Sequence, residues 1–322
     1  MRPNFDTGRV RVRLDCAEGK ISGVLVSCER PVVATVLHGR AADQVENMIP
    51  LLFSLCGKAQ AQAAKLALAA AYGEECVSRL DPDVQRESLR EHLWRCLIDF
   101  PHQLGEVPLQ QEFVNAARWI TEGDRSQLYS LLSSMHVAAL YQRIQQIVEP
   151  HPVSPSWLPQ LDARRSLAEW PRLSAEFCRQ PDWRGCAAET GAMARQQWAG
   201  KNSISLFSAC WQARFDELLE WARKDSPIGA VGTVSAIPVA PGIGRSLVET
   251  ARGLLMHEIV LEKGLVADYH IAAPTEWNFH PQGALAHHLL GQGSGNRDAL
   301  RQSAARVITA LDPCVPWELE WA

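Results

Sequence analysis

The sequence predicts a mainly α-helical protein with small β-hairpins near both ends, which places it in the α+β class. Near the N-terminus, RVRVRL (9–14) alternates basic and apolar residues, as in a strand with one buried face. A leucine recurs every four residues from Leu89 to Leu97, which is the apolar stripe of an amphipathic helix. EIVLEKGLVADYHI (258–271) has the pattern of a second hairpin, with a Lys-Gly turn at its centre.

The first hairpin is completed by ISGVLVS (21–27), which follows a turn that contains Gly19. The chain from Ala41 to Tyr72 is rich in Ala, Leu and Gln, which favour helix. Because Pro50 lacks an amide donor, it should break or start a helix. We expect one long helix that begins at residue 51 or 52 and ends at Gly73.

The middle of the chain is predicted to be helical. Asp81-Pro82 is a strong helix start, with a capping acid followed by a proline in the first turn. EPHPVSPSWLP (149–159) carries four prolines and is predicted to be a linker or an ordered surface crossing. Further helices are expected at about 109–122, 125–148, 203–223 and 297–311.

Composition excludes several classes of protein. The 322 residues include 32 basic and 36 acidic side chains, a net charge of −4, which argues against a nucleic-acid-binding protein with a basic surface. No apolar run approaches the roughly 20 residues that span a bilayer, so we expect no membrane segment. The first ten residues hold no apolar core, so a secretory signal is not expected and the cytoplasm is the expected location. The nine cysteines include no CxxC, which removes support for a zinc ribbon.

Four segments contain residues that could carry chemistry. Cys56 lies near a predicted helix start, where the helix dipole can lower a thiol pKa, although a buried core cysteine is the simpler interpretation. Arg252 precedes a glycine and an apolar segment; a buried Arg must be paired or bind an anion, but a surface Arg at a turn is the alternative. Pro274-Thr275 gives a rigid turn with a hydroxyl, or an ordinary loop. Cys314 follows Asp-Pro close to the C-terminus.

Other motifs are weaker. The glycines of PGIGRSL (241–247) lack a third glycine at the spacing of a dinucleotide-binding loop. No GxSxG nucleophile elbow is present either.

Taken in order, these segments resemble the large subunit of nickel–iron hydrogenases. LHGR (37–40) and LCGKAQAQA (55–63) are similar to the family's "LKGRDP" and "RxCGxCxxxH". ETARGLLMHEIVLEKGLVADYHIAAPTEWNFHP (249–281) is similar to "EAPRGxLxH", a hairpin and "VPTTWNxxP". LDPCVP (311–316) is similar to the start of "DPCxxCxxH", whereas the middle, about 75–240, shows no match. The resemblance implies a shortened hydrogenase large-subunit-like fold in a single domain, with segments 1–74, 75–240 and 241–322.

The departures from the family remove the nickel side of its metal centre. Phe53 and Trp317 stand where the family has two of its four metal-binding cysteines, and Gln60 and Glu320 replace histidines. The proton-relay Glu of the family's "RGxE" segment is missing, with Ala34 at its position. Two thiolates cannot complete a nickel site that requires four soft ligands, so neither bound nickel nor hydrogenase activity is expected.

The resemblance implies that the iron side is kept. In the family, the iron carries two cyanides and one carbon monoxide, the Fe(CN)2(CO) unit. Arg252 and the Pro274-Thr275 turn match the residues that hydrogen-bond the cyanides, and Arg is a donor that never deprotonates. Leu254, with Leu255, is expected to shelter the carbon monoxide. The metal ligands are then expected to be Cys56 and Cys314.

This combination is typical of HupK/HoxV-type maturation proteins, which look like large subunits and are not enzymes. The resemblance implies a scaffold that holds the Fe(CN)2(CO) unit in transit. Its partners would be the Hyp-type carrier chaperone that delivers the unit and the apo large subunit that receives it. A metal-free interaction chaperone is the alternative. A third possibility is an enzyme that uses mononuclear iron or a reactive Cys56, although no general base is near Cys56 in the sequence.

Overall fold

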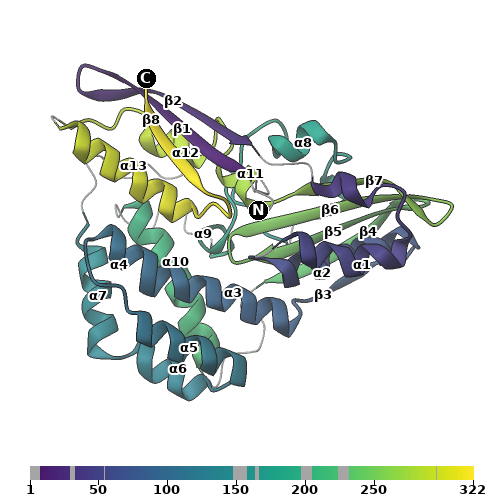
Figure 1. Ribbon diagram of the computed structural model, residues 1–322, viewed down its shortest axis with the longest axis horizontal. Coiled ribbons are helices and arrows are strands. Elements are labelled where there is room, and N and C mark those ends of the chain that lie inside the picture. The colour runs from purple at the N-terminus through teal and green to yellow at the C-terminus, as the bar shows by residue number, and fades with distance from the viewer. Residues whose placement is uncertain are drawn as a thin grey trace, which may run out of the picture.

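The computed structural model describes residues 8–29, 33–53, 55–147, 158–163, 167–196, 205–223, 232–294 and 296–322. Within these ranges, helices outnumber strands, and the helices surround two separate sheets (Figure 1). The α+β class predicted from the sequence is confirmed. No helix in the described ranges has both the length and the apolar character needed to cross a bilayer.

The larger sheet has five antiparallel strands in the order β3-β4-β5-β6-β7. Four consecutive strands form a meander, and the edge strand β3 comes from a distant part of the chain. The strands are β3 (Cys76–Arg79), β4 (Thr233–Ala240), β5 (Ile243–Thr250), β6 (Gly253–Glu262) and β7 (Leu265–Ala272). The tight turn between β5 and β6 contains Arg252, so this turn positions a predicted site residue.

The two faces of this sheet pack against different partners. Helices α1 (Ala42–Leu52) and α2 (Gly57–Ala71) cover one face, where Val248 and Leu255 pack against alanines of α2. On the other face, Leu247 and Leu254 pack against tryptophans near η3 (Leu167–Glu169) and α8 (Ala175–Arg179). Neighbouring residues of a strand therefore belong to different cores, as the two-residue period of a strand requires.

Helix α2 lies very close to the sheet at Gly244. An ideal Cβ on Gly244 would be 2.0 Å from the carbonyl oxygen of Ala67 and 2.2 Å from the amide nitrogen of Ala71. Only glycine fits this contact. The small side chains of α2 and the glycine of β5 together set the position of the helix that begins directly after Cys56.

The remaining helices enclose the largest core, which includes Phe100, Phe207 and Trp211. A π-helical turn, η2 (Arg95–Asp99), joins α3 to α4; such turns are frequent at functional sites. The helices of this region are α3 (Pro82–Trp94), α4 (Phe100–Gln103), α5 (Gln110–Glu122), α6 (Arg125–Leu132), α7 (Met135–Gln145), α9 (Ala192–Arg195), α10 (Leu206–Ala222) and α13 (Arg297–Leu311).

A three-stranded sheet in the order β2-β1-β8 closes the fold. The strand β1 (Arg9–Ala17) pairs antiparallel with β2 (Lys20–Glu29) and parallel with β8 (Trp317–Trp321). Strands from the two ends of the chain thus lie side by side (Figure 1). The short elements are η1 (Val33–Leu37), α11 (Pro274–Asn278) and α12 (Ala284–Leu289).

Several predicted elements are confirmed. Both hairpins form, and the last helix has the predicted bounds. Asp81 caps α3, because its carboxylate accepts a hydrogen bond from the amide of Asp83 at 2.7 Å. Most of the proline-rich segment 149–159 and the start of the helix predicted at 203 lie outside the described residues.

Two predicted helices differ from the observed helices in their bounds. The helix expected from residue 51 or 52 to Gly73 is wrong, because α1 extends through Pro50 to Leu52 and α2 starts afresh at Gly57. The helix expected at 125–148 is divided at Ser134, whose hydroxyl accepts a hydrogen bond from the amide of Val137 and caps α7.

The sequence also failed to indicate strands β3, β4, β5 and β8. Strand β5 is buried over nearly its whole length, so no alternation of polar and apolar residues marks it. Its polar side chains are buried with partners: Arg245 bonds Glu258 of β6, and Ser246 donates to the carbonyl of Ala63 at 2.7 Å. The sheet is therefore larger than a hairpin.

Candidate functional site

Cys56 lies in the short break between α1 and α2, at the N-cap position of α2. It packs against the apolar cluster that contains Leu255 and Ala273. Glu87 of α3 satisfies free backbone amides in the first turn of α2. Its carboxylate accepts hydrogen bonds from the amides of Lys58 at 2.9 Å and Ala59 at 3.1 Å. A helix start and the sheet thus fix the position of the thiol.

The thiol of Cys56 is protonated at neutral pH. Burial raises its pKa to about 12, and the neighbouring Cys314 adds to this rise. Gln60 and Arg252 act in the opposite direction but are weaker. The lowered pKa that a helix start can give is therefore not found at Cys56, and the raised pKa agrees with the simpler interpretation of a cysteine removed from water.

Cys314 lies between α13 and β8 and contacts the predicted Pro274-Thr275 turn. The hydroxyl of Thr275 donates a hydrogen bond to Sγ of Cys314 at 3.0 Å. In return, the backbone amide of Cys314 donates to Oγ1 of Thr275 at 3.2 Å. Pro274 begins α11 and is buried, so the turn is rigid. Thr275 therefore holds the sulfur, a contact that the sequence did not indicate.

Arg252 is buried, with 6% of its surface exposed, which excludes a surface residue at a turn. Its Nε donates to Asp312 at 3.0 Å, and its Nη2 donates to Glu91 at 2.6 Å. The side chain of Asn278 holds the backbone carbonyl of Arg252 at 3.0 Å. Burial lowers the pKa of Arg252, but Asp312 and Glu91 raise it by more, so the guanidinium stays charged. Within the described part of the chain, Nη1 makes no hydrogen bond and remains available to a ligand.

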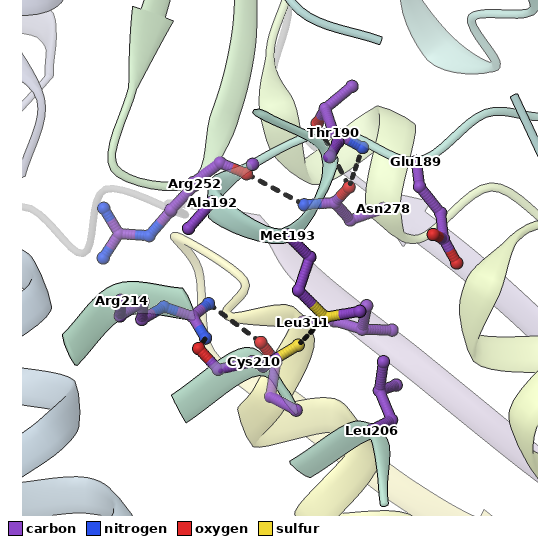
Figure 2. Close-up of a pocket in the computed structure, with 13 residues that line it drawn as sticks. Glu189, Thr190, Ala192, Met193, Leu206, Cys210, Arg214, Arg252, Asn278 and Leu311 are labelled. Atoms are coloured by element: carbon purple, nitrogen blue, oxygen red, sulfur yellow. Dashed lines mark hydrogen bonds between the residues drawn. The ribbon is translucent and has the colours of Figure 1, made fainter. Parts of the chain in front are cut away.

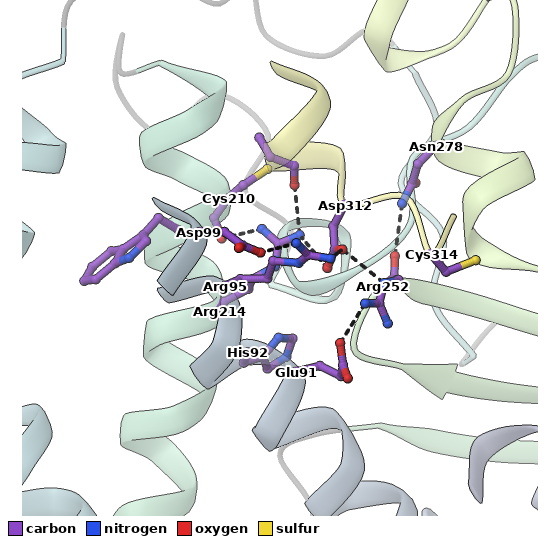
Figure 3. Close-up of polar contacts among 12 residues, drawn as sticks. Glu91, His92, Arg95, Asp99, Cys210, Arg214, Arg252, Asn278, Asp312 and Cys314 are labelled. Atoms are coloured by element: carbon purple, nitrogen blue, oxygen red, sulfur yellow. Dashed lines mark hydrogen bonds and ion pairs between the residues drawn. The ribbon is translucent and has the colours of Figure 1, made fainter. Parts of the chain in front are cut away.

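Asp312 is the centre of the charged cluster (Figure 3). Besides its contact with Arg252, the carboxylate of Asp312 forms an ion pair with the guanidinium of Arg95 at 2.6 Å. The guanidinium of Arg214 lies 3.8 Å from the same carboxylate. Arg95 also pairs with Asp99 across the π-helical turn. Burial raises the pKa of Asp312, but the three guanidinium groups outweigh burial and hold it below its usual range. The cluster joins α3, α10, α13 and the β5–β6 turn directly beside the two cysteines.

The structure thus brings together residues from four separate segments. Cys56 is close enough to Cys314 and to Arg252 for both to affect its pKa, and Cys314 also affects the pKa of Arg252. In the described residues, no group of three His, Cys, Asp or Glu side chains could hold a metal ion. Two cysteines and a charged guanidinium lie in this part of the described chain.

The position of Leu254 differs from the sequence expectation. Leu254 packs on the far face of the sheet, in the cluster that contains Trp277. Leu255 lies on the near face, in the cluster against which Cys56 packs. Because neighbouring strand residues point to opposite faces, only Leu255 can border this site. Of the two leucines expected to shelter the carbon monoxide, only Leu255 lies on the face of the sheet where Cys56 packs.

The positions that would complete a nickel site carry no sulfur. Phe53 ends α1 and packs against the sheet. Trp317 and Glu320 belong to β8, where Glu320 is exposed. Ala34 is buried in the core below η1 and provides no carboxylate.

A pocket lies on the other side of Arg252 (Figure 2). It is lined largely by apolar side chains, among them Met193, Leu206 and Leu311. The guanidinium of Arg252 points away from Met193 and Leu311 in this view. Neither Cys56 nor Cys314 is among the residues that line this pocket.

Three residues of the site were missed in the sequence. Glu91 and Asp312 pair with Arg252, and Gln60 donates to Sγ of Cys56 at 3.7 Å. The adjacency of Asp312 to Pro313 and Cys314 was a usable signal. Nothing in the sequence near Glu91 indicated its role, because α3 meets the β5–β6 turn only in the folded chain.

The chain is similar to known hydrogenase expression/formation proteins. The chain is 30% identical to the hydrogenase expression/formation protein HoxV of Cupriavidus necator, over 98% of this chain and 96% of that protein. It is 29% identical to the hydrogenase expression/formation protein HupK of Azotobacter vinelandii, over 97% of this chain and 98% of that protein. No family model matches.

Solved structures show the fold. The Ni-Fe-Se hydrogenase of D. vulgaris Hildenborough matches with a TM-score of 0.60 and 13% identity, over 93% of this chain and 94% of that chain. An NAD+-reducing [NiFe]-hydrogenase matches with a TM-score of 0.53 and 13% identity, over 92% and 93%. The fold is that of the hydrogenase large subunit, as the sequence predicted, and the chain belongs to the HoxV/HupK family of hydrogenase expression/formation proteins.

Proposed function

We propose that this maturation protein is a scaffold that binds the Fe(CN)2(CO) unit in transit through Cys56 and Cys314. One observation supports the proposal: Cys56, Cys314 and a buried, charged Arg252 interact electrostatically, while the positions of the nickel side hold Phe53 and Trp317. A fold kept only for contact with other proteins has no need of two partly buried thiols near a buried cation.

The chemistry of loading follows from the site. A thiol binds iron as a thiolate, so Cys56, whose pKa is raised by burial, would lose its proton as its sulfur binds the unit. The free Nη1 of Arg252 donates to a cyanide nitrogen, and Arg is suited to this because it stays charged. The hydroxyl of Thr275 is directed at Cys314 and steadies that sulfur. Leu255 provides an apolar neighbour for carbon monoxide.

In the proposed function, the protein binds no nickel and is not an enzyme. A nickel site would need more thiolates than the two present here. With Ala34 in place of a proton-relay carboxylate, splitting of hydrogen would lack its base. The site is suited to holding a preformed unit and releasing it.

The proposed partners act before and after this step in the cytoplasm. A Hyp-type carrier chaperone delivers the Fe(CN)2(CO) unit, and the apo large subunit of a nickel–iron hydrogenase receives it.

Infrared spectroscopy tests the proposal. The protein is purified without oxygen from cells that make the Hyp proteins. We expect one carbonyl and two cyanide bands, which Cys56→Ala and Cys314→Ala abolish without unfolding the chain. Cys186→Ala, at an exposed cysteine, is the matched control and should keep the bands. A silent spectrum from protein that still binds the large subunit would instead identify a metal-free interaction chaperone.

A further inference from the structure

A chain of buried hydrogen bonds extends from Cys56 into the core. Gln60 lies one helical turn after Cys56, is 1% exposed, and directs its amide nitrogen at Sγ over 3.7 Å. Its amide oxygen is 2.8 Å from Nε2 of His257, and Nδ1 of His257 is 2.7 Å from the hydroxyl of Tyr269. His257 and Tyr269 are 0% and 2% exposed, so water does not compete for these bonds.

The hydrogen bonds of this chain have one direction. Gln60 Oε1 can only accept, so Nε2 of His257 must carry the proton that it donates. A neutral imidazole has one donor and one acceptor, so Nδ1 accepts from the hydroxyl of Tyr269. Burial lowers the pKa of His257 to about 3, so the ring is neutral at physiological pH. In this arrangement Tyr269 donates to Nδ1 of His257, and Nε2–H of His257 donates to the Gln60 amide oxygen, which leaves the amide N–H directed at Cys56.

This direction suits a sulfur bound to metal. A metal-bound thiolate has only lone pairs and can only accept, whereas a free thiol can also donate its proton. The amide of Gln60 presents N–H to the sulfur, and to turn it around, His257 and Tyr269 would have to exchange donor and acceptor roles together. Cys314 has the equivalent donor in the hydroxyl of Thr275, at 3.0 Å. Each sulfur thus has one uncharged donor on a buried side chain.

We propose that Gln60 is a positioning residue that holds Cys56 in its iron-binding state, through an amide whose orientation is locked by His257 and Tyr269. The inference rests on the proposed function and adds to it. A hydrogen bond to a coordinated sulfur withdraws electron density, so the iron donates less to carbon monoxide. The position of the carbonyl band therefore reports the bond directly.

The first arm of the test uses protein loaded with the Fe(CN)2(CO) unit by the Hyp proteins. Gln60→Met keeps the length of the side chain but removes the donor. We expect the bands to persist, because both sulfur ligands remain, and the carbonyl band to move to lower wavenumber. Tyr269→Phe, remote from the sulfur, should shift the band in the same direction by less. Lys65→Gln, at an exposed position of the same helix, should leave it in place. A carbonyl band that does not move in Gln60→Met overturns the proposal.

The second arm needs no iron and separates this inference from the proposed function. Nitrogen chemical shifts of ¹⁵N-histidine-labelled protein identify which ring nitrogen of His257 carries the proton. We expect the Nε2-protonated form in the wild type and a mixture of tautomers in Tyr269→Phe. A ring protonated at Nδ1 in the wild type overturns the lock. If the wild-type infrared spectrum shows no carbonyl or cyanide bands, the proposed function fails. The protonated ring nitrogen of His257 still shows whether the hydrogen bonds orient the Gln60 amide.

Discussion

Single residues at this site are governed by buried charge. Arg252, Arg95 and Arg214 surround Asp312; Asp312, Arg252 and Arg214 are buried, and Arg95 is partly exposed. Such a cluster is costly to form but more costly to break, because one missing partner leaves an unpaired charge in the interior. Stability and ligand contact therefore depend on the same side chains.

Replacement of Arg252 tests this dependence. Arg252→Leu should lower the free energy of unfolding by about 3 kcal/mol, since Asp312 and Glu91 lose a partner while Arg95 remains. Urea unfolding followed by circular dichroism measures the change. Arg252→Lys keeps the charge without the forked geometry, so we expect a smaller loss of stability. If Arg252→Leu were as stable as the wild type, the charged cluster would not be a unit.

His257 predicts a dependence of stability on pH. Burial lowers its pKa to about 3, whereas the unfolded chain binds the same proton near pH 6.5. As pH falls from about 6.5 toward 3, protons favour the unfolded state, so this histidine costs up to about 1.4 kcal/mol per pH unit in that window. His257→Gln should reduce the slope of unfolding free energy against pH between 6 and 4. An unchanged slope would mean that the ring is not buried in its neutral form.

At the scale of elements, the contact of α2 with β5 determines where Cys56 lies. The helix is built from alanines and approaches the strand at Gly244, where no side chain fits. The sequence showed the composition of α2 and the glycines of PGIGRSL, yet it did not show that the two are in contact. Only pairing of β4, β5 and β6 places Gly244 beneath the helix.

A methyl group at this contact should displace α2. Gly244→Ala is expected to cost about 3 kcal/mol, because the added Cβ meets backbone atoms that cannot move independently. Thermal unfolding measures the loss. Gly264→Asn is a suitable control, since Gly264 has nothing within 4 Å and Asn tolerates its positive φ. Equal effects of the two changes would contradict the close contact.

At the scale of the whole molecule, the two sulfurs come from opposite ends of the sequence. Cys56 is held by α2 and the five-stranded sheet, and Cys314 is held between α13 and β8. Strand β8 pairs with β1, so the position of Cys314 depends on a sheet formed by both ends of the chain. Docking of the last strand completes the site.

Loosening of β8 should make Cys314 more accessible to solvent and leave the accessibility of Cys56 unchanged. Leu319→Ala deletes a buried side chain of β8 and should cost about 2–4 kcal/mol. Hydrogen exchange should quicken in β8 and β1, and alkylation of Cys314 should become faster, while Cys56 keeps its wild-type rate. The modified peptides are quantified by mass spectrometry. Equal acceleration at both cysteines would show that the two halves open together.

Restoring thiols should not restore an enzyme. The double variant Phe53→Cys and Trp317→Cys has a cysteine at each of the four positions that bind the metal centre in hydrogenases. We expect no hydrogen turnover in an amperometric assay, because Ala34 cannot relay protons and Trp317 lies in a strand. Detectable hydrogen uptake would refute the view that the fold now serves only maturation.

The sequence by itself determined the fold class, both hairpins and most helices, and it singled out the two cysteines, Arg252 and Thr275 as candidate site residues. These were readable because periodicity, capping residues and short motifs are local properties of the chain. The tertiary structure alone decided that Leu255 borders the site in place of Leu254, that Asp312 and Glu91 pair with Arg252, and that Gln60 faces Cys56. The physical reason is that strand register and helix packing join residues distant in sequence, and burial then sets the charge and hydrogen bonding of each.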